Sequence, residues 1–159
     1  MPSEEEQIFK TFQQEMRNEM ELEVLYLQDG ASVPFLAYAE SAGYDLAACL
    51  LNDAGRPFTT TIAPHTTKLI GTGLALRPPA GHLILICSRS GLAASSVFVG
   101  NSPGVVDPNY TGEIKVLLHN SGLEPAYVKH KDRICQALVV PFAVSTLREV
   151  HAFPDTERG

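Results

Sequence analysis

The chain has 159 residues, of which 45% are hydrophobic, and a net charge of −6 at pH 7. This length fits one domain with a normal core, and the hydrophobic content is too high for a disordered chain. The acidic balance and the absence of a Lys/Arg run argue against a nucleic acid as the partner, and no apolar run is long enough to span a membrane.

A helical pattern occupies the first part of the chain, and Ser3 and Glu6 have the spacing of a capping box. The apolar residues that follow recur every four positions: Ile8, Phe12, Met16 and Met20, with Phe9 beside them. The pattern predicts one amphipathic helix of about four to five turns within residues 1–21. We expect this helix to pack on its own domain or on another subunit, and a dedicated protein partner is the alternative.

From residue 22 onward, short apolar runs alternate with turn residues. The runs rich in Val, Ile, Leu and Thr are 22–27, 68–76, 82–87, 114–119 and 134–141. Turn signals fall at 52–55, 78–81, 101–104, 107–112 and 120–122. Many short strands at this spacing predict an all-β protein, a barrel or jelly roll. We expect it to span residues 22–150 and to be followed by an extended tail at 151–159.

The three cysteines, Cys49, Cys87 and Cys135, are widely spaced in apolar surroundings. This arrangement is typical of reduced core residues and not of a disulfide set or a zinc site. The acidic start, MPSEEEQ, lacks the character of a signal peptide. We therefore expect a soluble intracellular protein of the cytoplasm or nucleus.

Two polar segments in the first half carry candidate chemistry. In AGYDLAA (42–48), Asp45 lies between apolar neighbours, so its carboxylate needs a hydrogen-bond partner or an ion. SRSGLAA (88–94) offers a guanidinium, two hydroxyls and a glycine amide, which suit phosphate oxygens. A structural hydrogen bond for the first segment and a polar strand cap for the second explain these residues as well.

Two further polar segments lie in the second half. In KDRICQALVVP (131–141), the amide of Gln136 lies among apolar residues and must find partners, and we expect Asp132 and Arg133 to hold a turn. In GVVDPNYTG (104–112), Asp-Pro-Asn favours a type I turn that begins at Asp107. These residues alone leave open whether Asp107 only starts a turn or also acts as a base.

Several enzyme classes are excluded by the motifs that the sequence lacks. No pair of histidines has metal-ligand spacing, and the chain has neither a P-loop nor a nucleophile elbow. A zinc hydrolase, a P-loop NTPase and an α/β-hydrolase are therefore excluded.

The four polar segments, in this order along one small domain, resemble the first four motifs of the trimeric dUTPase family, the deoxyuridine triphosphate nucleotidohydrolases. The third match is GNSPGVVDPNYTGEI (100–114), and TGLAL (72–76) fits the strand between the first two motifs. The resemblance covers roughly residues 22–159 and leaves the N-terminal helix outside. It implies a jelly-roll-like β-barrel that forms a homotrimer with sites between subunits.

The resemblance also implies an activity, the Mg²⁺-dependent hydrolysis of dUTP to dUMP and pyrophosphate by attack of water at the α-phosphorus. Asp107 would be the catalytic base, and Pro108 would bias it toward an extended backbone, so the turn and the base are compatible. Asp45 and Gln136 would reach Mg²⁺ only through its waters. The residues implied to bind substrate are Arg89, Ser90, Gly91, Asn101, Gly104, Val105, Val106, Tyr110, Lys115, Gln136 and Arg158.

Within that set, the resemblance gives different parts of dUTP to different residues. Asn101 and the backbone of a hairpin from Asn101 to Tyr110 would recognise uracil. Tyr110 would pack under the deoxyribose and leave no room for a 2′-hydroxyl. Arg89, Ser90 and Gly91 would hold the phosphates.

The sequence departs from the family pattern at several places. The family's fifth motif is a glycine-rich segment that begins with Arg-Gly and continues to a phenylalanine that stacks on uracil. Here only Arg158 and Gly159 match it, and the sequence leaves open a truncated record or a protein without this lid. Ser88 replaces a usual proline, Pro108-Asn109 replaces a more acidic pair, and Lys131 replaces a common glycine.

Two other functions remain as alternatives. A non-catalytic binding protein on the same fold would use the N-terminal helix or surface loops to engage a partner, and the incomplete fifth motif favours it. A deoxycytidine triphosphate deaminase is the other, but the hairpin around Asp107 and Tyr110 favours uracil.

Overall fold

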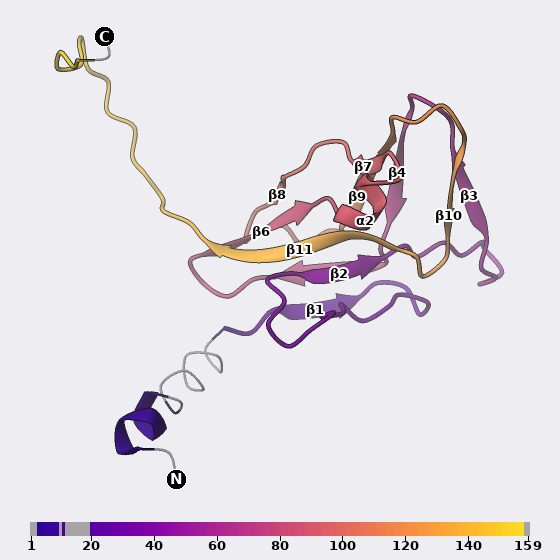
Figure 1. The fold of residues 1–159 in the computed structure, drawn as a ribbon, viewed down its shortest axis with the longest axis horizontal. Helices are drawn as coiled ribbons and strands as arrows, with labels where there is room; N and C mark the ends of the chain where they lie inside the picture. The colour runs from indigo at the N-terminus through magenta and orange to yellow at the C-terminus, as the bar shows by residue number, and fades with distance from the viewer. Residues whose placement is uncertain (1–2, 10, 12–19, 158–159) are drawn as a thin grey trace.

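The computed structural model describes residues 3–9, 11 and 20–157, and these form mostly β-structure (Figure 1). Apart from a helix over residues 4–9, the only helix in this part of the chain is α2 (Ser90–Ala93). The strands are β1 (Glu23–Tyr26), β2 (Tyr44–Ala47), β3 (Thr59–Ile62), β4 (Thr67–Gly71), β5 (Leu74–Arg77), β6 (His82–Cys87), β7 (Val97–Val99), β8 (Gly104–Val106), β9 (Lys115–Asn120), β10 (Ala126–Lys129) and β11 (Arg133–Pro141). The predicted all-β class is confirmed.

All strand pairs are antiparallel and form four sheets: β2-β11-β6-β8, β4-β9-β7, β1-β5 and β10-β3. Alternation of side chains directs one face of each strand inward. In β6, Ile84 and Ile86 are buried, and in β9, Val116 and Leu118 are buried. These side chains belong to one apolar core that the sheets enclose.

The run at 68–76 does not form one strand as predicted but two, β4 and β5. Gly73 between them has φ +69°, a left-handed conformation that interrupts the extended backbone. A Cβ at Gly73 would also lie 2.9 Å from the Cβ of Ala31. This corner between β4 and β5 therefore needs glycine.

The strands that the apolar runs did not indicate are short or polar on one side. β3 has the sequence TTTI, with an alternating exposed and buried pattern, and β10 pairs with it. β7 has only three residues, VFV. The β-branched threonines fit a half-buried pleated surface, but they do not form an apolar run.

The capping box at the N-terminus is confirmed. The Ser3 N–H donates to Glu6 Oε2 at 2.9 Å, and the Glu6 N–H donates to Ser3 Oγ at 3.2 Å. Ile8 and Phe9 are 65% and 60% exposed, so the expected packing on the same domain is wrong for these two side chains. Phe12 and Met16, which carried most of the longer helical pattern, lie outside the described residues.

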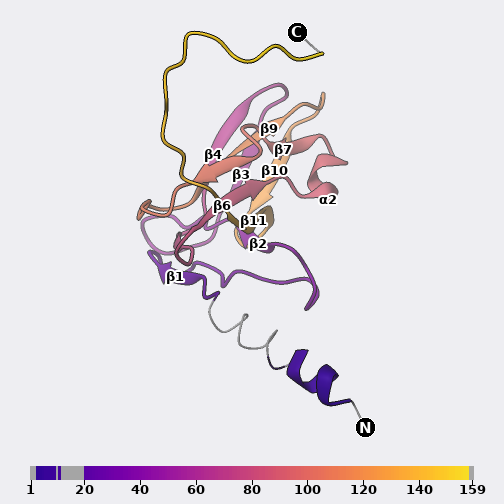
Figure 2. The ribbon, with the colours of Figure 1, turned by 90° about the vertical axis from the view of Figure 1, so that its left-hand side faces the viewer.

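Beyond β11, residues 142–157 form no strand, and every residue among them is exposed. Figures 1 and 2 show this segment leaving the end of β11 and running away from the sheets. Cys49 and Cys135 are buried and Cys87 is half-buried, and all three are free thiols, as predicted. Within the described ranges, no helix has the length and apolar character needed to cross a membrane.

Candidate active site

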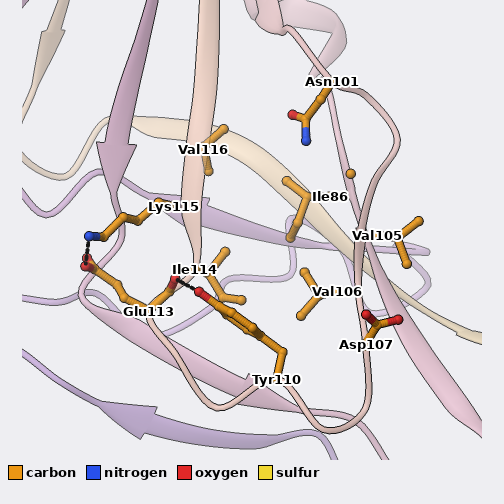
Figure 3. A pocket seen from close by; sticks show the side chains of 11 residues that line it. Ile86, Asn101, Val105, Val106, Asp107, Tyr110, Glu113, Ile114, Lys115 and Val116 are labelled. Atoms are coloured by element: carbon orange, nitrogen blue, oxygen red, sulfur yellow. Dashed lines mark hydrogen bonds and ion pairs between the residues drawn. The ribbon is translucent and has the colours of Figure 1, made fainter.

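A pocket of about 210 Å³ lies beside β8, the turn that follows it and the start of β9 (Figure 3). Its lining combines apolar side chains from the strands with polar side chains from the turns. The residues that line it are Ile86, Asn101, Gly104, Val105, Val106, Asp107, Tyr110, Glu113, Ile114, Lys115 and Val116. A small pocket with an apolar wall and a few converging polar groups is typical of a small-molecule site.

Asp107 begins a tight turn at one end of the pocket, as the Asp-Pro-Asn sequence predicted. The Tyr110 N–H donates to the Asp107 carbonyl at 3.0 Å, which closes the turn. Asp107 itself remains exposed, so its carboxylate is open to water and to a bound molecule. The turn thus links Asp107 and Tyr110 and places both on the wall of one pocket.

The segment before this turn is not the hairpin that was predicted between Asn101 and Tyr110. β8 pairs with β6, with Gly104 opposite Ile86 and Val106 opposite Ile84, while β7 pairs with β9. The chain from β7 to β8 therefore crosses between two sheets. All three residues of β8 pair with β6, which is six residues long.

Asn101 and Gly104 come close together at the end of the pocket away from Tyr110 (Figure 3). A Cβ at Gly104 would lie 3.1 Å from Asn101 Nδ2, which is tighter than ordinary van der Waals contact. A larger residue at this position would push the amide aside. Gly104 therefore lets the Asn101 side chain lie against the backbone of β8.

Tyr110 is held at the other end. Its Oη donates to the Glu113 carbonyl at 3.0 Å, and its ring lies so close to Gly112 that a Cβ there would be 2.7 Å from Oη. Lys115 Nζ lies 3.5 Å from Glu113 Oε2 (Figure 3). Lys115 is thus paired with Glu113, and the lining of the pocket carries charges of both signs.

A second polar cluster surrounds Asp45. Its Oδ1 accepts from Arg89 Nε at 2.8 Å, and its Oδ2 accepts from Arg133 Nη1 at 3.1 Å. The side chain of Asp45 is only 12% exposed, so the two guanidinium groups compensate a nearly buried carboxylate. Asp45 thus has charged partners, and not only the backbone hydrogen bond that was the structural alternative.

Asp132 and Arg133 were predicted to hold a turn together, and this prediction is wrong for Arg133. Asp132 does so alone, because its Oδ2 accepts from the Lys129 N–H at 2.7 Å. Arg133 opens β11 opposite Ala47 of β2, which brings its guanidinium to Asp45. The same guanidinium lies 5.6 Å from the centre of the Phe35 ring.

Gln136 finds its partner just past the end of the neighbouring strand β6. Its Nε2 donates to the Ser88 carbonyl at 2.9 Å, so the half-buried amide has a hydrogen-bond partner. In the register of the sheet, Gln136 lies opposite both Asp45 and Cys87. Ser90 and Gly91 follow Arg89 at the start of α2 and are exposed.

The pocket and the Asp45 cluster lie at opposite edges of one sheet. The strand order β2-β11-β6-β8 puts Asp45 on one edge strand and Asp107 just past the other (Figure 1). Neighbouring strands are about 4.8 Å apart, so three steps across the sheet separate the two groups by about 14 Å. A single chain therefore brings together Asn101, Asp107, Tyr110 and Lys115 in one group, and Asp45, Arg89 and Gln136 in another.

The groups around Asp45 in the single chain do not form a direct metal site. Both carboxylate oxygens of Asp45 already accept from arginines, which leaves no free pair of anionic ligands. The described part of the chain contains no group of three or more His, Cys, Asp or Glu side chains that could hold a metal. Two guanidinium groups around one carboxylate give the cluster a net positive charge, which suits the oxygens of a phosphate ligand.

Sequence reasoning missed Glu113, Ile86 and Phe35 and gave Arg133 a different role. Glu113 directly follows the predicted turn segment 107–112, and this closeness to Tyr110 in the sequence could have identified it as a site residue. Phe35 lay outside every apolar run, although it bridges to Asp45 through two backbone hydrogen bonds of 3.0 and 2.7 Å. Arg158, the predicted residue of the fifth motif, lies outside the described residues.

Solved structures with the same architecture define the class of fold. A mutant dUTPase from Staphylococcus aureus phage phi11, described with a structural Mg(II) ion, matches with a TM-score of 0.74 at 20% identity, over 85% of this chain and 99% of that chain. A mutant dUTPase from Staphylococcus bacteriophage 80alpha with dUpNHpp matches with a TM-score of 0.76 at 23% identity, over 87% and 94% of the two chains. The fold is thus that of phage dUTPases.

Comparison with known sequences goes beyond the fold and identifies the family of the chain. The dUTPase family model matches residues 29–159. The deoxyuridine 5'-triphosphate nucleotidohydrolase of Nautilia profundicola is 40% identical over 141 residues, 88% of this chain and 94% of the relative. The corresponding protein of Beijerinckia indica is 39% identical over 132 residues, 82% and 80% of the two chains. The chain belongs to the dUTPase family.

Proposed function

We propose that this protein hydrolyses dUTP to dUMP and pyrophosphate. The observation that carries the proposal is the turn from Asp107 to Tyr110, which puts a carboxylate and an aromatic ring on the wall of one small pocket. Membership of the dUTPase family supports the same activity.

The pocket would bind the base and the sugar. Asn101 and the backbone of Gly104, Val105 and Val106 line the pocket, where they would recognise uracil through hydrogen bonds. A site built around such groups rejects a base that lacks the matching donors and acceptors, because its own polar groups then stay unpaired. Tyr110 would pack under the deoxyribose and exclude a 2′-hydroxyl.

Asp107 would act as the general base. Its carboxylate would take a proton from the water that attacks the α-phosphorus, and pyrophosphate would leave. The exposed carboxylate at the rim of the pocket supports this role, since the attacking water must reach it from solvent. A positioned base of this kind contributes about 10²–10⁴-fold to the rate.

The triphosphate would be held by Arg89, Ser90 and Gly91, together with Lys115, Gln136 and Arg158. Bound Mg²⁺ would neutralise charge on the triphosphate oxygens. Asp45 and Gln136 would hold that ion through its waters only. Because Arg89 is paired with Asp45 in the free chain, the carboxylate and the incoming phosphates would compete for one guanidinium.

The protein would act as a homotrimer with sites between subunits. Asp45 and Asp107 belong to opposite edges of one sheet, so a second copy that brings its Asp45 edge to the pocket would complete the site. The β-domain, residues 22–150, would form this assembly, with the tail at 151–159 beyond it. Exposed Ile8 and Phe9 support a role for the N-terminal helix in contacts with another subunit or another protein.

The proposal is tested by pyrophosphate release in the presence of Mg²⁺ from dUTP, dCTP, dTTP and UTP in parallel. We expect release from dUTP and rates lower by orders of magnitude from the other three. Ammonia release from dCTP would identify a deaminase instead. Binding of dUTP without any release would favour the non-catalytic alternative.

A further inference from the structure

The Glu113 carboxylate has partners of its own outside the ligand pocket. Its Oε1 accepts from the Gly73 N–H at 2.9 Å, and its side chain is only 17% exposed. Gly73 lies in the corner between β4 and β5, which is distant from Glu113 in the sequence. A carboxylate that accepts a backbone N–H in a partly buried place holds two segments together more firmly than an exposed pair would.

The same corner binds the residue after Glu113. Thr72 donates to the Ile114 carbonyl through its N–H at 3.2 Å and through Oγ1 at 2.8 Å. The Ile114 N–H donates to the Leu74 carbonyl at 2.8 Å. The start of β9 is therefore fixed to the corner between β4 and β5 by these four hydrogen bonds, and the Glu113 carboxylate accepts one of them.

Tyr110 depends on this anchored segment. Its Oη donates to the Glu113 carbonyl, and its ring lies against Gly112. Tyr110 is also a wall of a neighbouring groove of about 380 Å³ beside β1 and β5, which includes Leu25 and Thr111. Tyr110 lines both cavities, so a side chain that lost its anchor would have space to turn away from the pocket toward the groove.

We propose that Glu113 is a positioning residue for sugar recognition. Its carboxylate fixes the carbonyl that receives Tyr110 Oη and so keeps the ring in the wall of the pocket. The selection of a 2′-deoxyribose over a ribose is thereby tied to the corner between β4 and β5, whose residues Thr72 to Leu74 are not part of the pocket lining. This inference rests on the sugar-binding role of Tyr110 in the proposed function.

The geometry offers a variant that acts on Glu113 from outside the pocket. A Cβ at Gly71 would overlap Glu113 Oε1, so Gly71→Ala displaces the carboxylate while the residue types that line the pocket stay the same. Gly100→Ala is the matched control, because its Cβ would meet no atom closer than 3.6 Å. Glu113→Gln is the conservative variant, since its amide oxygen can still accept from Gly73.

The experiment measures the binding of dUDP and of UDP by calorimetry, with pyrophosphate release from dUTP as a separate assay. We expect the wild-type protein to prefer dUDP, and this preference to fall about tenfold in Glu113→Ala, since the loss of one buried hydrogen bond has an effect of this order. Gly71→Ala should show a similar fall, whereas Glu113→Gln and Gly100→Ala should keep the preference. Tyr110→Phe should also lower it, and adding Glu113→Ala to that variant should have little further effect.

A fall in affinity for dUDP and UDP by the same factor in Glu113→Ala would assign the residue a structural role and overturn the inference. An unchanged preference, or a wild-type protein that binds both equally, would overturn it as well. Melting curves identify any variant that is unfolded, and Glu113→Gln then decides by keeping or losing the preference. A protein that prefers dUDP but releases no pyrophosphate would contradict the proposed activity and leave the role of Glu113 standing.

Discussion

At the scale of single residues, Asp107 carries the chemistry that we propose, so Asp107→Asn is the direct substitution. The amide keeps the size of the side chain and leaves the backbone turn to Tyr110 in place. We expect turnover of dUTP to fall by about 10²–10⁴-fold while dUDP binding is kept. Asp53→Asn, in an exposed turn outside the pocket, should leave both unchanged. Near-normal turnover in Asp107→Asn would remove Asp107 from the role of base.

Lys131 has a backbone conformation that favours glycine. Its φ is 71°, in the left-handed region, and this is the position at which the sequence departs from the family's glycine. Because that region costs a residue with a Cβ about 1–2 kcal/mol, Lys131→Gly should raise the free energy of unfolding by about 1 kcal/mol. Urea unfolding measures this change. Lys129→Gly, within β10, should instead destabilise, and a loss of stability in Lys131→Gly would contradict the explanation.

The buried thiol of Cys135 should make the stability of the fold decrease with rising pH in the alkaline range. Burial raises the pKa of its thiol from 9.0 to about 12. The unfolded chain therefore ionises first, so its contribution to stability is complete below pH 9 and is lost as pH rises from about 9 toward 12, by about 1.4 kcal/mol per pH unit. We expect urea midpoints to fall between pH 8 and pH 10, with a smaller fall in Cys135→Ala. Equal falls in both proteins would contradict this.

At the scale of elements, Asn120 joins the end of β9 to two other segments. It is 1% exposed, its Nδ2 donates to the carbonyls of Ile62 and Glu124, and its Oδ1 accepts from the Gly122 N–H at 2.9 Å. Asn120→Ala leaves these groups without partners and should lower the free energy of unfolding by about 1–3 kcal/mol. Ser121→Ala, on an exposed hydroxyl next to it, should change it by less than about 0.5 kcal/mol. Equal effects would show that the Asn120 network does not stabilise the fold.

The observed strands show which parts of the fold the sequence patterns could predict. β6 was predicted with its observed bounds, because an apolar run between turn signals describes a strand whose neighbours cover both sides. β3 and β10 were missed, because threonine and alternating polar residues hide a half-buried strand. The run at 68–76 was read as one strand because the break at Gly73 depends on a close approach to Ala31, which the local sequence does not show.

The sequence motifs predicted residues that lie together in the pocket, but they did not predict which side chains contact one another. The pocket contains Asn101, Asp107 and Tyr110 because one short segment supplies them all. The partners of Asp45 come from Arg89 and Arg133, which lie 44 and 88 residues away, and sequence spacing carries no sign of that pairing. Glu113 was overlooked for the same reason, since its carboxylate is held by Gly73 across the fold.

At the scale of the whole molecule, we expect each active site to be divided between copies of the chain. The strand order of the sheet separates Asp45 from Asp107, because Asp45 lies on one edge strand and Asp107 lies just past the other. A closed homotrimer repeats one contact three times, so the same pair of edges would complete every site. We therefore expect a trimeric mass by analytical ultracentrifugation, and a stable, active monomer would contradict a shared site.

The most direct test of this account mixes two variants that are each inactive, Asp45→Asn and Asp107→Asn. After joint unfolding and refolding in equal amounts, random trimers would combine an intact Asp45 edge with an intact Asp107 turn at about a quarter of the sites. We predict that pyrophosphate release from dUTP returns to about a quarter of the wild-type rate, while each variant refolded alone stays inactive. Mixed protein that forms trimers but releases no more pyrophosphate than the separate variants would contradict a site shared between chains.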